Sequence, residues 1–153
     1  MRKGYGVKDI NNNEEVDIHT HFFIASNSKL FTGTALAKLD YEKKLNLNDK
    51  ISKYYPDFTL YDKTMTENVT IKDMLTHRIG TKTFQGDFTF WNTNLSSTEI
   101  MQKMRYLAPI NAFRDAYGYC NSCYLTAGMV IPKVTNQSWE SYITEEFLKP
   151  LRM

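Results

Sequence analysis

The chain has 153 residues, of which 42% are hydrophobic and 24% are charged, an ordinary composition for one globular domain and not for a disordered tail. Its 19 Lys and Arg residues exceed its 17 Asp and Glu residues by two, and the basic residues form no long runs, so we expect no nucleic-acid partner. Its apolar stretches are far shorter than the roughly 20 residues that span a bilayer, and its polar start lacks the apolar core of a signal peptide. We therefore expect no membrane segment and no targeting signal in this sequence.

The beginning of the chain has the pattern of a β-hairpin. Apolar residues partly alternate between residues 4 and 24, and Asn11, Asn12 and Asn13 form a turn cluster between them. We predict two short antiparallel strands here. Because two strands alone are marginally stable, the pattern indicates that other strands of the sheet lie outside this sequence.

After Ser26 the apolar spacing becomes that of a helix. Phe31, Ala35 and Leu39 recur every four residues, which predicts a long helix with Ser26 at its entrance. Similar patterns predict the other elements, namely helices over residues 70–76, 97–107, 124–134 and 138–148 and irregular segments over residues 54–69 and 79–94. Irregular segments of that length are usually functional.

Three local signals concern the ends of these helices. Ser96 and Glu99 have the spacing of a capping box. Pro132 is expected to kink or end its helix, because a proline in a helix interior costs about 3 kcal/mol. Asn136 is expected to end the same helix in a left-handed conformation.

A Ser-x-x-Lys motif, Ser26 to Lys29, stands at the start of the first predicted helix. Three-residue spacing places both side chains on one helix face. A serine becomes a strong nucleophile when a neighbouring base takes its proton, and a lysine serves as that base when burial lowers its pKa. The helix N-terminus adds amide donors beside the oxyanion that forms on attack. Alone the motif is weak, because a capping serine with a solvated lysine has the same spacing.

Segments along nearly the whole chain resemble one family of enzymes. In chain order they are residues 23–32, 44–49, 51–56, 67–71, 75–80, 119–121, 127–128, 138–140 and 150–153. Together they resemble the β-lactamase-related serine hydrolases, which include class C β-lactamases, penicillin-binding proteins and D-alanyl-D-alanine carboxypeptidases. The resemblance implies an α+β, β-lactamase/penicillin-binding-protein-like fold. Here it would form one domain over residues 1–153, mostly the helical region plus a short antiparallel sheet fragment.

The resemblance also implies roles for individual residues. Ser26 would be the acylated nucleophile and Lys29 its proton partner. Tyr119-Cys120-Asn121 is similar to the family's Tyr-x-Asn element, in which Tyr119 would share the base role and Asn121 would bind the substrate amide. The implied reaction forms and hydrolyses an acyl-enzyme on a small-molecule or peptide substrate (an amide, peptide, lactam or ester), with no metal and no organic cofactor. Family members are often extracytoplasmic.

The family's third element, a Lys-Thr-Gly or His-x-Gly on a strand, is expected after Tyr119 but is not found in this sequence. Lys82-Thr83-Phe84 is rejected as that element, because it precedes Tyr119 and has a bulky Phe84 where the strand must approach the substrate. We therefore expect an incomplete domain that lacks its first strand and the C-terminal part of its sheet. Unpaired strand edges would then favour self-association.

Three alternatives stay open. Cys120 and Cys123 have the spacing of a dithiol redox pair, but no βαβ pattern precedes them, and we expect two half-buried thiols that are reduced and dispensable. His19, His21 and His77 suggest a metal site, although no fourth ligand is apparent and exposed strand histidines are favoured for the first two. The third alternative is a non-catalytic relative that binds a partner, or an inactive fragment.

Overall fold

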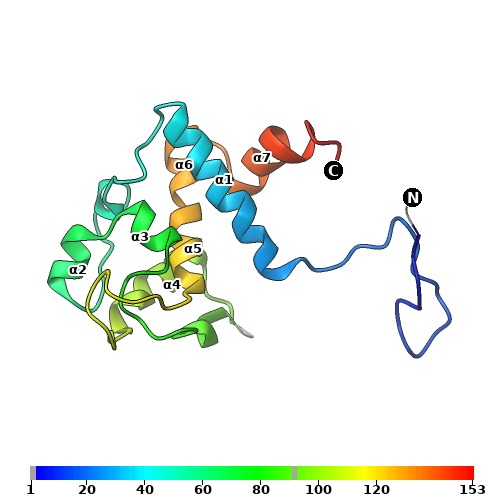
Figure 1. Ribbon diagram of the computed structural model, residues 1–153, viewed down its shortest axis with the longest axis horizontal. Helices are drawn as coiled ribbons and strands as arrows, with labels where there is room; N and C mark the ends of the chain where they lie inside the picture. The colour runs from blue at the N-terminus through cyan, green and yellow to red at the C-terminus, as the bar shows by residue number, and fades with distance from the viewer. Residues whose placement is uncertain (1–2, 91–92) are drawn as a thin grey trace.

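Helices form nearly all of the regular structure in the computed structural model, which describes residues 3–90 and 93–153. The α-helices are α1 (Ser28–Tyr41), α2 (Lys63–Asn68), α3 (Ile71–Leu75), α4 (Ser97–Lys103), α5 (Asn121–Gly128), α6 (Val130–Thr135) and α7 (Trp139–Ile143). The shorter elements are the 3-10 helices η1 (Ala25–Asn27), η2 (Ile51–Lys53), η3 (Asp87–Phe90) and η4 (Met104–Tyr106) and a π-helical turn, η5 (Thr144–Leu148). The segment before η1 runs away from the packed helices (Figure 1). Among the residues described, no helix is long and apolar enough to cross a membrane.

The predicted antiparallel sheet fragment is wrong for the part of the chain that the structure describes. The segment does turn at the asparagine cluster, and Val7 and Glu15 form one antiparallel bridge, but no strand forms in residues 3–90 or 93–153. The apolar side chains of this segment lie in solvent, since Tyr5 is 77% exposed and Ile10 is 93% exposed. A two-stranded ribbon without a packed face is marginal in water, which explains why the alternating pattern yields only a bridge.

The central element of the helical body is α5, which packs against α1, α3, α4 and α6. The apolar face predicted for the first helix is confirmed, because Ala35, Leu36 and Leu39 of α1 are fully buried. On α5 the buried positions are mostly small, and they include Ala127 and Gly128. Small side chains let the two helix backbones approach closely, which brings the start of α1 beside the start of α5.

Two of the three predicted helix-end signals are confirmed directly. Ser96 and Glu99 form a capping box at α4, and Asn136 ends α6 in the left-handed conformation with φ 57°. The short helix α2 was not predicted, because it lies inside the segment expected to be irregular. Its N-terminus is capped by Asp62, whose carboxylate accepts the N–H of Met65 at 2.9 Å.

The helix predicted over residues 124–134 is instead two helices. It begins earlier, at Asn121, and is interrupted at Met129 between α5 and α6. Pro132 has no N–H to donate to the carbonyl of Gly128, so the regular hydrogen-bond ladder breaks in this turn. The interruption lies three residues before Pro132, where the expected effect of this proline on its helix would act, and the start of the helix is corrected to the residue that follows Cys120.

The two thiols, expected to be half-buried, are fully buried. Cys120 is 1% exposed, Cys123 is fully enclosed, and no disulfide joins them. Cys120 is the N-cap of α5, where its Sγ accepts the N–H of Cys123 at 3.2 Å. Burial raises the pKa of the Cys123 thiol, so this side chain acts as a small apolar core residue.

The different positions of the thiols predict different effects of serine. In Cys120→Ser the hydroxyl can accept the same N–H, and serine is a good N-cap, so we expect nearly unchanged stability. In Cys123→Ser a hydroxyl is buried in the core, and we expect a loss of about 1–3 kcal/mol in the free energy of unfolding. Thermal and urea unfolding of both variants measures this difference. Equal losses would contradict the roles assigned here.

Asp73 is a buried carboxylate that joins α3 to a distant loop. Arg114 donates Nε to its Oδ1 at 2.8 Å and Nη2 to its Oδ2 at 2.7 Å, and Thr70 adds a capping-box bond at 2.9 Å. Desolvation raises the pKa of Asp73, but the hydrogen bonds from Arg114 and Thr70 outweigh it and hold the pKa below its ordinary value. The carboxylate therefore stabilises the fold in its charged form.

We expect Asp73→Asn to lower the free energy of unfolding by about 1–3 kcal/mol at neutral pH, because the buried ion pair loses its charge. The folded pKa is lowered, so this stabilisation is fully present above the unfolded value of about 3.9 and is lost as the pH falls through the folded value. Urea unfolding of both proteins from neutral to acidic pH tests this. Asp57→Asn, at an exposed position, is the control and should change stability little at any pH.

Candidate active site

Ser26 and Lys29 lie at the entrance of α1, as the sequence predicts. Ser26 is in η1, the 3-10 turn that leads into α1, and Lys29 is in the first turn of α1 itself. Ala25, directly before Ser26, has φ 45°, in the left-handed region that residues with a side chain rarely adopt. Backbone strain of this kind clusters at functional sites, where the surrounding structure holds it in place.

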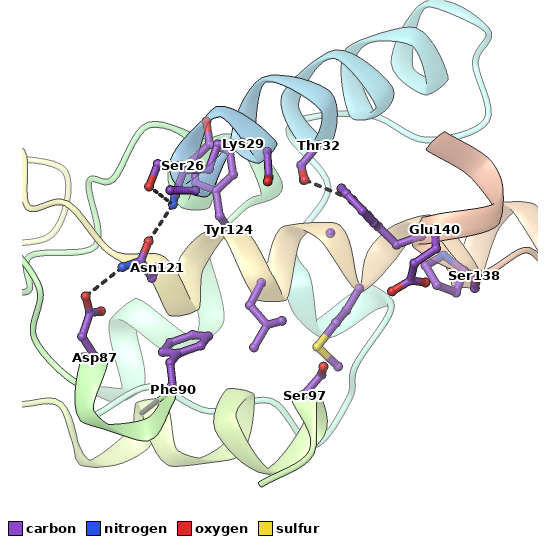
Figure 2. Close-up of a pocket in the computed structure, with 17 residues that line it drawn as sticks. Ser26, Lys29, Thr32, Asp87, Phe90, Ser97, Asn121, Tyr124, Ser138 and Glu140 are labelled. Atoms are coloured by element: carbon purple, nitrogen blue, oxygen red, sulfur yellow. Dashed lines mark hydrogen bonds between the residues drawn. The ribbon is translucent and has the colours of Figure 1, made fainter. Parts of the chain in front are cut away.

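The structure brings the four predicted site residues together. Ser26 Oγ accepts hydrogen bonds from Lys29 Nζ at 3.2 Å and from the Tyr119 hydroxyl at 2.6 Å. Lys29 Nζ also donates to Asn121 Oδ1 at 2.6 Å, and Figure 2 shows this side chain reaching from α1 to the start of α5. Residues more than 90 positions apart in the sequence thus form one connected group.

Tyr119 is the titratable group in direct contact with the serine. Desolvation raises the pKa of its phenol, but the hydrogen bonds to Lys29 and Ser26, together with the charge of Lys29, outweigh desolvation and hold the pKa below 10. Lys29 Nζ also lies 4.8 Å from the centre of the Tyr119 ring. A phenol in these surroundings loses its proton at a lower pH than a free tyrosine does.

His77 packs against Tyr119 in this site. Its ring stacks on the Tyr119 ring with centroids 4.7 Å apart, and its Nδ1 accepts the N–H of Cys120 at 3.0 Å. Burial and the charge of Lys29 lower the pKa of His77, which favours the neutral ring that this acceptor role requires. Within residues 3–90 and 93–153, no three His, Cys, Asp or Glu side chains are grouped to hold a metal.

The backbone before Tyr119 packs tightly against the loop that contains Lys82-Thr83-Phe84. A Cβ added at Gly118 would lie 1.9 Å from the carbonyl oxygen of Thr81, so only glycine fits there. Thr83 Oγ1 accepts the Tyr119 N–H at 3.2 Å, and the Phe84 N–H donates to the Tyr119 carbonyl at 2.8 Å. This tripeptide therefore holds the Tyr119 backbone, and it lies in a turn region of the loop.

Sequence reasoning missed one polar residue of the site, Asp87. Its Oδ2 accepts a hydrogen bond from Asn121 Nδ2 at 2.8 Å, which extends the connected group by one residue (Figure 2). Asp87 is the first residue of η3, inside the long segment predicted to be irregular. Its place in such a loop was the only sequence signal, and it did not single out this residue.

A cavity of about 670 Å³ opens beside the Ser26 group, lined by residues from η1, α1, η3, α4, α5, α6 and α7. Its lining is largely apolar and includes Phe90, Leu125, Met129 and Trp139. The Trp139 indole is fixed by a 3.0 Å hydrogen bond from Nε1 to Thr32 Oγ1. The arrangement can therefore hold an apolar group while a polar group lies against Ser26.

Comparison with known proteins identifies a matching family and similar curated proteins. A family model described as Beta-lactamase matches residues 1–153. Protein flp of Staphylococcus aureus is 37% identical over 158 residues, which cover 100% of this chain and 31% of that protein. Teichoic acid D-alanine hydrolase of Staphylococcus aureus is 33% identical over 95% of this chain and 34% of that protein. The chain thus spans about a third of the length of these curated relatives.

Solved structures agree on the fold. The crystal structure of FmtA from Staphylococcus aureus matches 98% of this chain and 40% of that one, with a TM-score of 0.78 and 26% identity. The octameric penicillin-binding protein homologue from Pyrococcus abyssi matches 99% of this chain and 36% of that one, with a TM-score of 0.81 and 27% identity. The packed helices are therefore a part of the β-lactamase/penicillin-binding-protein-like fold, and the chain belongs to the beta-lactamase family.

Proposed function

We propose that this chain supplies the nucleophile and the proton-transfer groups of a serine hydrolase that forms an acyl-enzyme at Ser26. The observation that supports this most directly is the pair of hydrogen bonds at Ser26 Oγ, 3.2 Å from Lys29 Nζ and 2.6 Å from the Tyr119 hydroxyl. A serine needs such partners, because its hydroxyl is a poor nucleophile until the proton is removed. The chain spans about a third of its curated relatives, so the activity of the whole protein is part of the proposal.

In the first step, Ser26 Oγ bonds to the substrate carbonyl carbon while its proton passes to the Tyr119 oxygen, whose ionised form the Lys29 ammonium stabilises. The lowered pKa of Tyr119 makes its phenol easier to ionise, and once ionised it is a proton acceptor for Ser26 across the 2.6 Å contact. The leaving group then takes this proton as the carbonyl re-forms. Water hydrolyses the Ser26 ester in the second step and regenerates the hydroxyl.

Asn121 binds the substrate amide or ester group in this proposal. Its Oδ1 accepts from Lys29, and one of its two Nδ2 hydrogens is used by Asp87. A side-chain amide has a second Nδ2 hydrogen, which is available to a substrate carbonyl. Asn121 lines the cavity, so the substrate can reach this donor.

The proposed substrates are small amides, peptides, lactams or esters, and their acyl transfer uses no metal and no organic cofactor. The cavity of about 670 Å³ is within the roughly 300–1,000 Å³ that small-molecule sites occupy. The similarity to a teichoic acid D-alanine hydrolase makes esters of amino acids the first class to test.

Covalent labelling tests the nucleophile. A fluorophosphonate should label the protein at Ser26, with the site located by mass spectrometry of the digested product. Ser26→Ala should abolish labelling, and Lys29→Ala should suppress it about as strongly, because residues that act as a unit lose function together. Lys72→Ala, at an exposed position on α3, is the matched lysine control and should keep the labelling rate. Label on Ser28, or full reactivity without Lys29, would refute the proposal.

The labelling rate should also depend on pH through Tyr119. Because the pKa of this phenol lies below 10, we expect the rate to rise with pH and the midpoint of this rise to lie below pH 10. Tyr119→Phe removes the titrating group, and we expect the rate to fall by about 100- to 10,000-fold and to lose this rise. Rates measured between pH 5 and 10 in both proteins decide the matter. An unchanged pH profile in the phenylalanine variant would assign the base role to another group.

A further inference from the structure

The lining of the cavity beside Ser26 contains more acidic than basic side chains. Its lining includes one cationic side chain, Lys29, and two carboxylates, Asp87 and Glu140. Figure 2 shows the two carboxylates at opposite ends, with Asp87 at the end where Ser26 lies and Glu140 on α7. Among the described residues that line the cavity, acidic groups therefore outnumber basic ones, and the imbalance favours a cationic ligand.

Asp87 has few partners for a carboxylate. Its Oδ2 accepts one hydrogen bond from the neutral amide of Asn121, and its Oδ1 is out of contact with solvent and has no hydrogen-bond partner in the described structure. No lysine, arginine or histidine of residues 3–90 or 93–153 forms an ion pair with it. Burying a carboxylate without such partners costs free energy that a bound cation would offset.

The position of Asp87 is fixed by a tight turn. Gly86 has φ 84°, and a Cβ added there would lie 3.0 Å from both methyl groups of Leu107. The Gly86 carbonyl accepts both the N–H and the hydroxyl of Thr89, at 3.0 and 2.8 Å. The same loop is joined to the Tyr119 backbone through Phe84. The backbone turn therefore fixes the position of Asp87 at the edge of the site.

Lys29 does not neutralise this carboxylate, because the amide of Asn121 lies between them. Asn121 accepts from Lys29 through Oδ1 and donates to Asp87 through Nδ2. From Asp87 to Ser26 the path is therefore three hydrogen bonds and one amide long. Because Asp87 and Ser26 line the same cavity, a substrate whose carbonyl lies at Ser26 can extend its ammonium group toward Asp87.

We propose that Asp87 is a specificity-determining residue that binds the ammonium group of an aminoacyl substrate. The preferred substrates are then esters or amides of amino acids with a free α-amino group, and N-acylated analogues are poor. This inference rests on the proposed serine hydrolase function, since that function places the acyl carbonyl at Ser26. The ammonium supplies the positive charge that no described side chain provides to Asp87, through a charge-assisted hydrogen bond to its carboxylate.

Equilibrium binding tests the inference without turnover. Alaninamide, as each enantiomer, and its N-acetyl counterpart are titrated into Ser26→Ala protein. We expect the free amine to bind about 10- to 100-fold more tightly for at least one enantiomer, and Asp87→Asn in the same background to bring that ratio close to one. Glu140→Gln removes the same charge from the far end of the cavity and should keep the preference.

The ratio of the affinities for the free amine and the N-acetyl ligand distinguishes amine recognition by Asp87 from a purely structural role of this residue. If Asp87 only orients Asn121, Asp87→Asn weakens both ligands equally and the ratio is unchanged, which overturns the inference. Equal affinity for both ligands in the Ser26→Ala protein, or loss of the preference in Glu140→Gln alone, overturns it as well. The same ratio measured as kcat/KM on alanine 4-nitroanilide and its N-acetyl form should follow the binding data.

Fluorophosphonate labelling distinguishes failure of this inference from failure of the proposed function, because the probe has no ammonium group. A protein that is labelled at Ser26 but has no preference for free amines retains the hydrolase function and loses the role of Asp87. A protein that prefers free amines but is not labelled has the binding site without the proposed nucleophile.

Discussion

The position of Lys29 Nζ is the constraint on which the whole site depends. It lies between Ser26 Oγ at 3.2 Å and Asn121 Oδ1 at 2.6 Å, and so it joins the start of α1 to the start of α5. The rings of Tyr119 and Tyr124 lie 4.8 and 5.6 Å from it, close enough for cation–π attraction. Two hydrogen bonds and two aromatic faces restrict a long side chain that would otherwise sample many rotamers.

This junction needs α1 and α5 to approach closely, and their small residues allow it. Gly128 faces α1, where an added Cβ would lie 3.5 Å from Thr32 Cγ2, and Thr32 in turn accepts the Trp139 N–H. Ala35 and Ala127 are both fully buried in the same core. Larger side chains would force the helices apart, and a separation of about 1 Å is enough to cost a catalytic arrangement much of its rate.

The sequence predicts the residues whose roles depend on local spacing. Ser26 and Lys29 lie three positions apart at a helix start, and Tyr119 and Asn121 are two apart before the next long helix, so their grouping followed from the resemblance. Asp87 could not be predicted this way, because its role depends on a glycine turn inside a loop with no periodic pattern.

Two other features were not predicted correctly from the sequence, namely the surroundings of His77 and the conformation of the segment before η1. Both depend on tertiary packing. His77 was considered with His19 and His21, but its surroundings, the Tyr119 ring and the Cys120 N–H, come from a segment more than 40 positions away. The alternating residues before η1 have the pattern of a strand and yet form only one bridge, because no packed face covers them. Local pattern was sufficient for most helices and insufficient where distant contacts decide the conformation.

The neutral amide of Asn121 lies between the ammonium of Lys29 and the carboxylate of Asp87 and hydrogen-bonds to both. The partial negative charge of Asn121 Oδ1 faces Lys29, and the partial positive charge of Nδ2 faces Asp87, so the two charges fix the orientation of the amide. The reversed amide would set donor against donor at Lys29 and acceptor against acceptor at Asp87. An aspartate in place of Asn121 would pair with Lys29 but repel Asp87, and an alanine would leave both without this partner. Because the amide satisfies each charge in part, Lys29 stays beside Ser26 instead of pairing with Asp87, and Asp87 retains its capacity for a further donor.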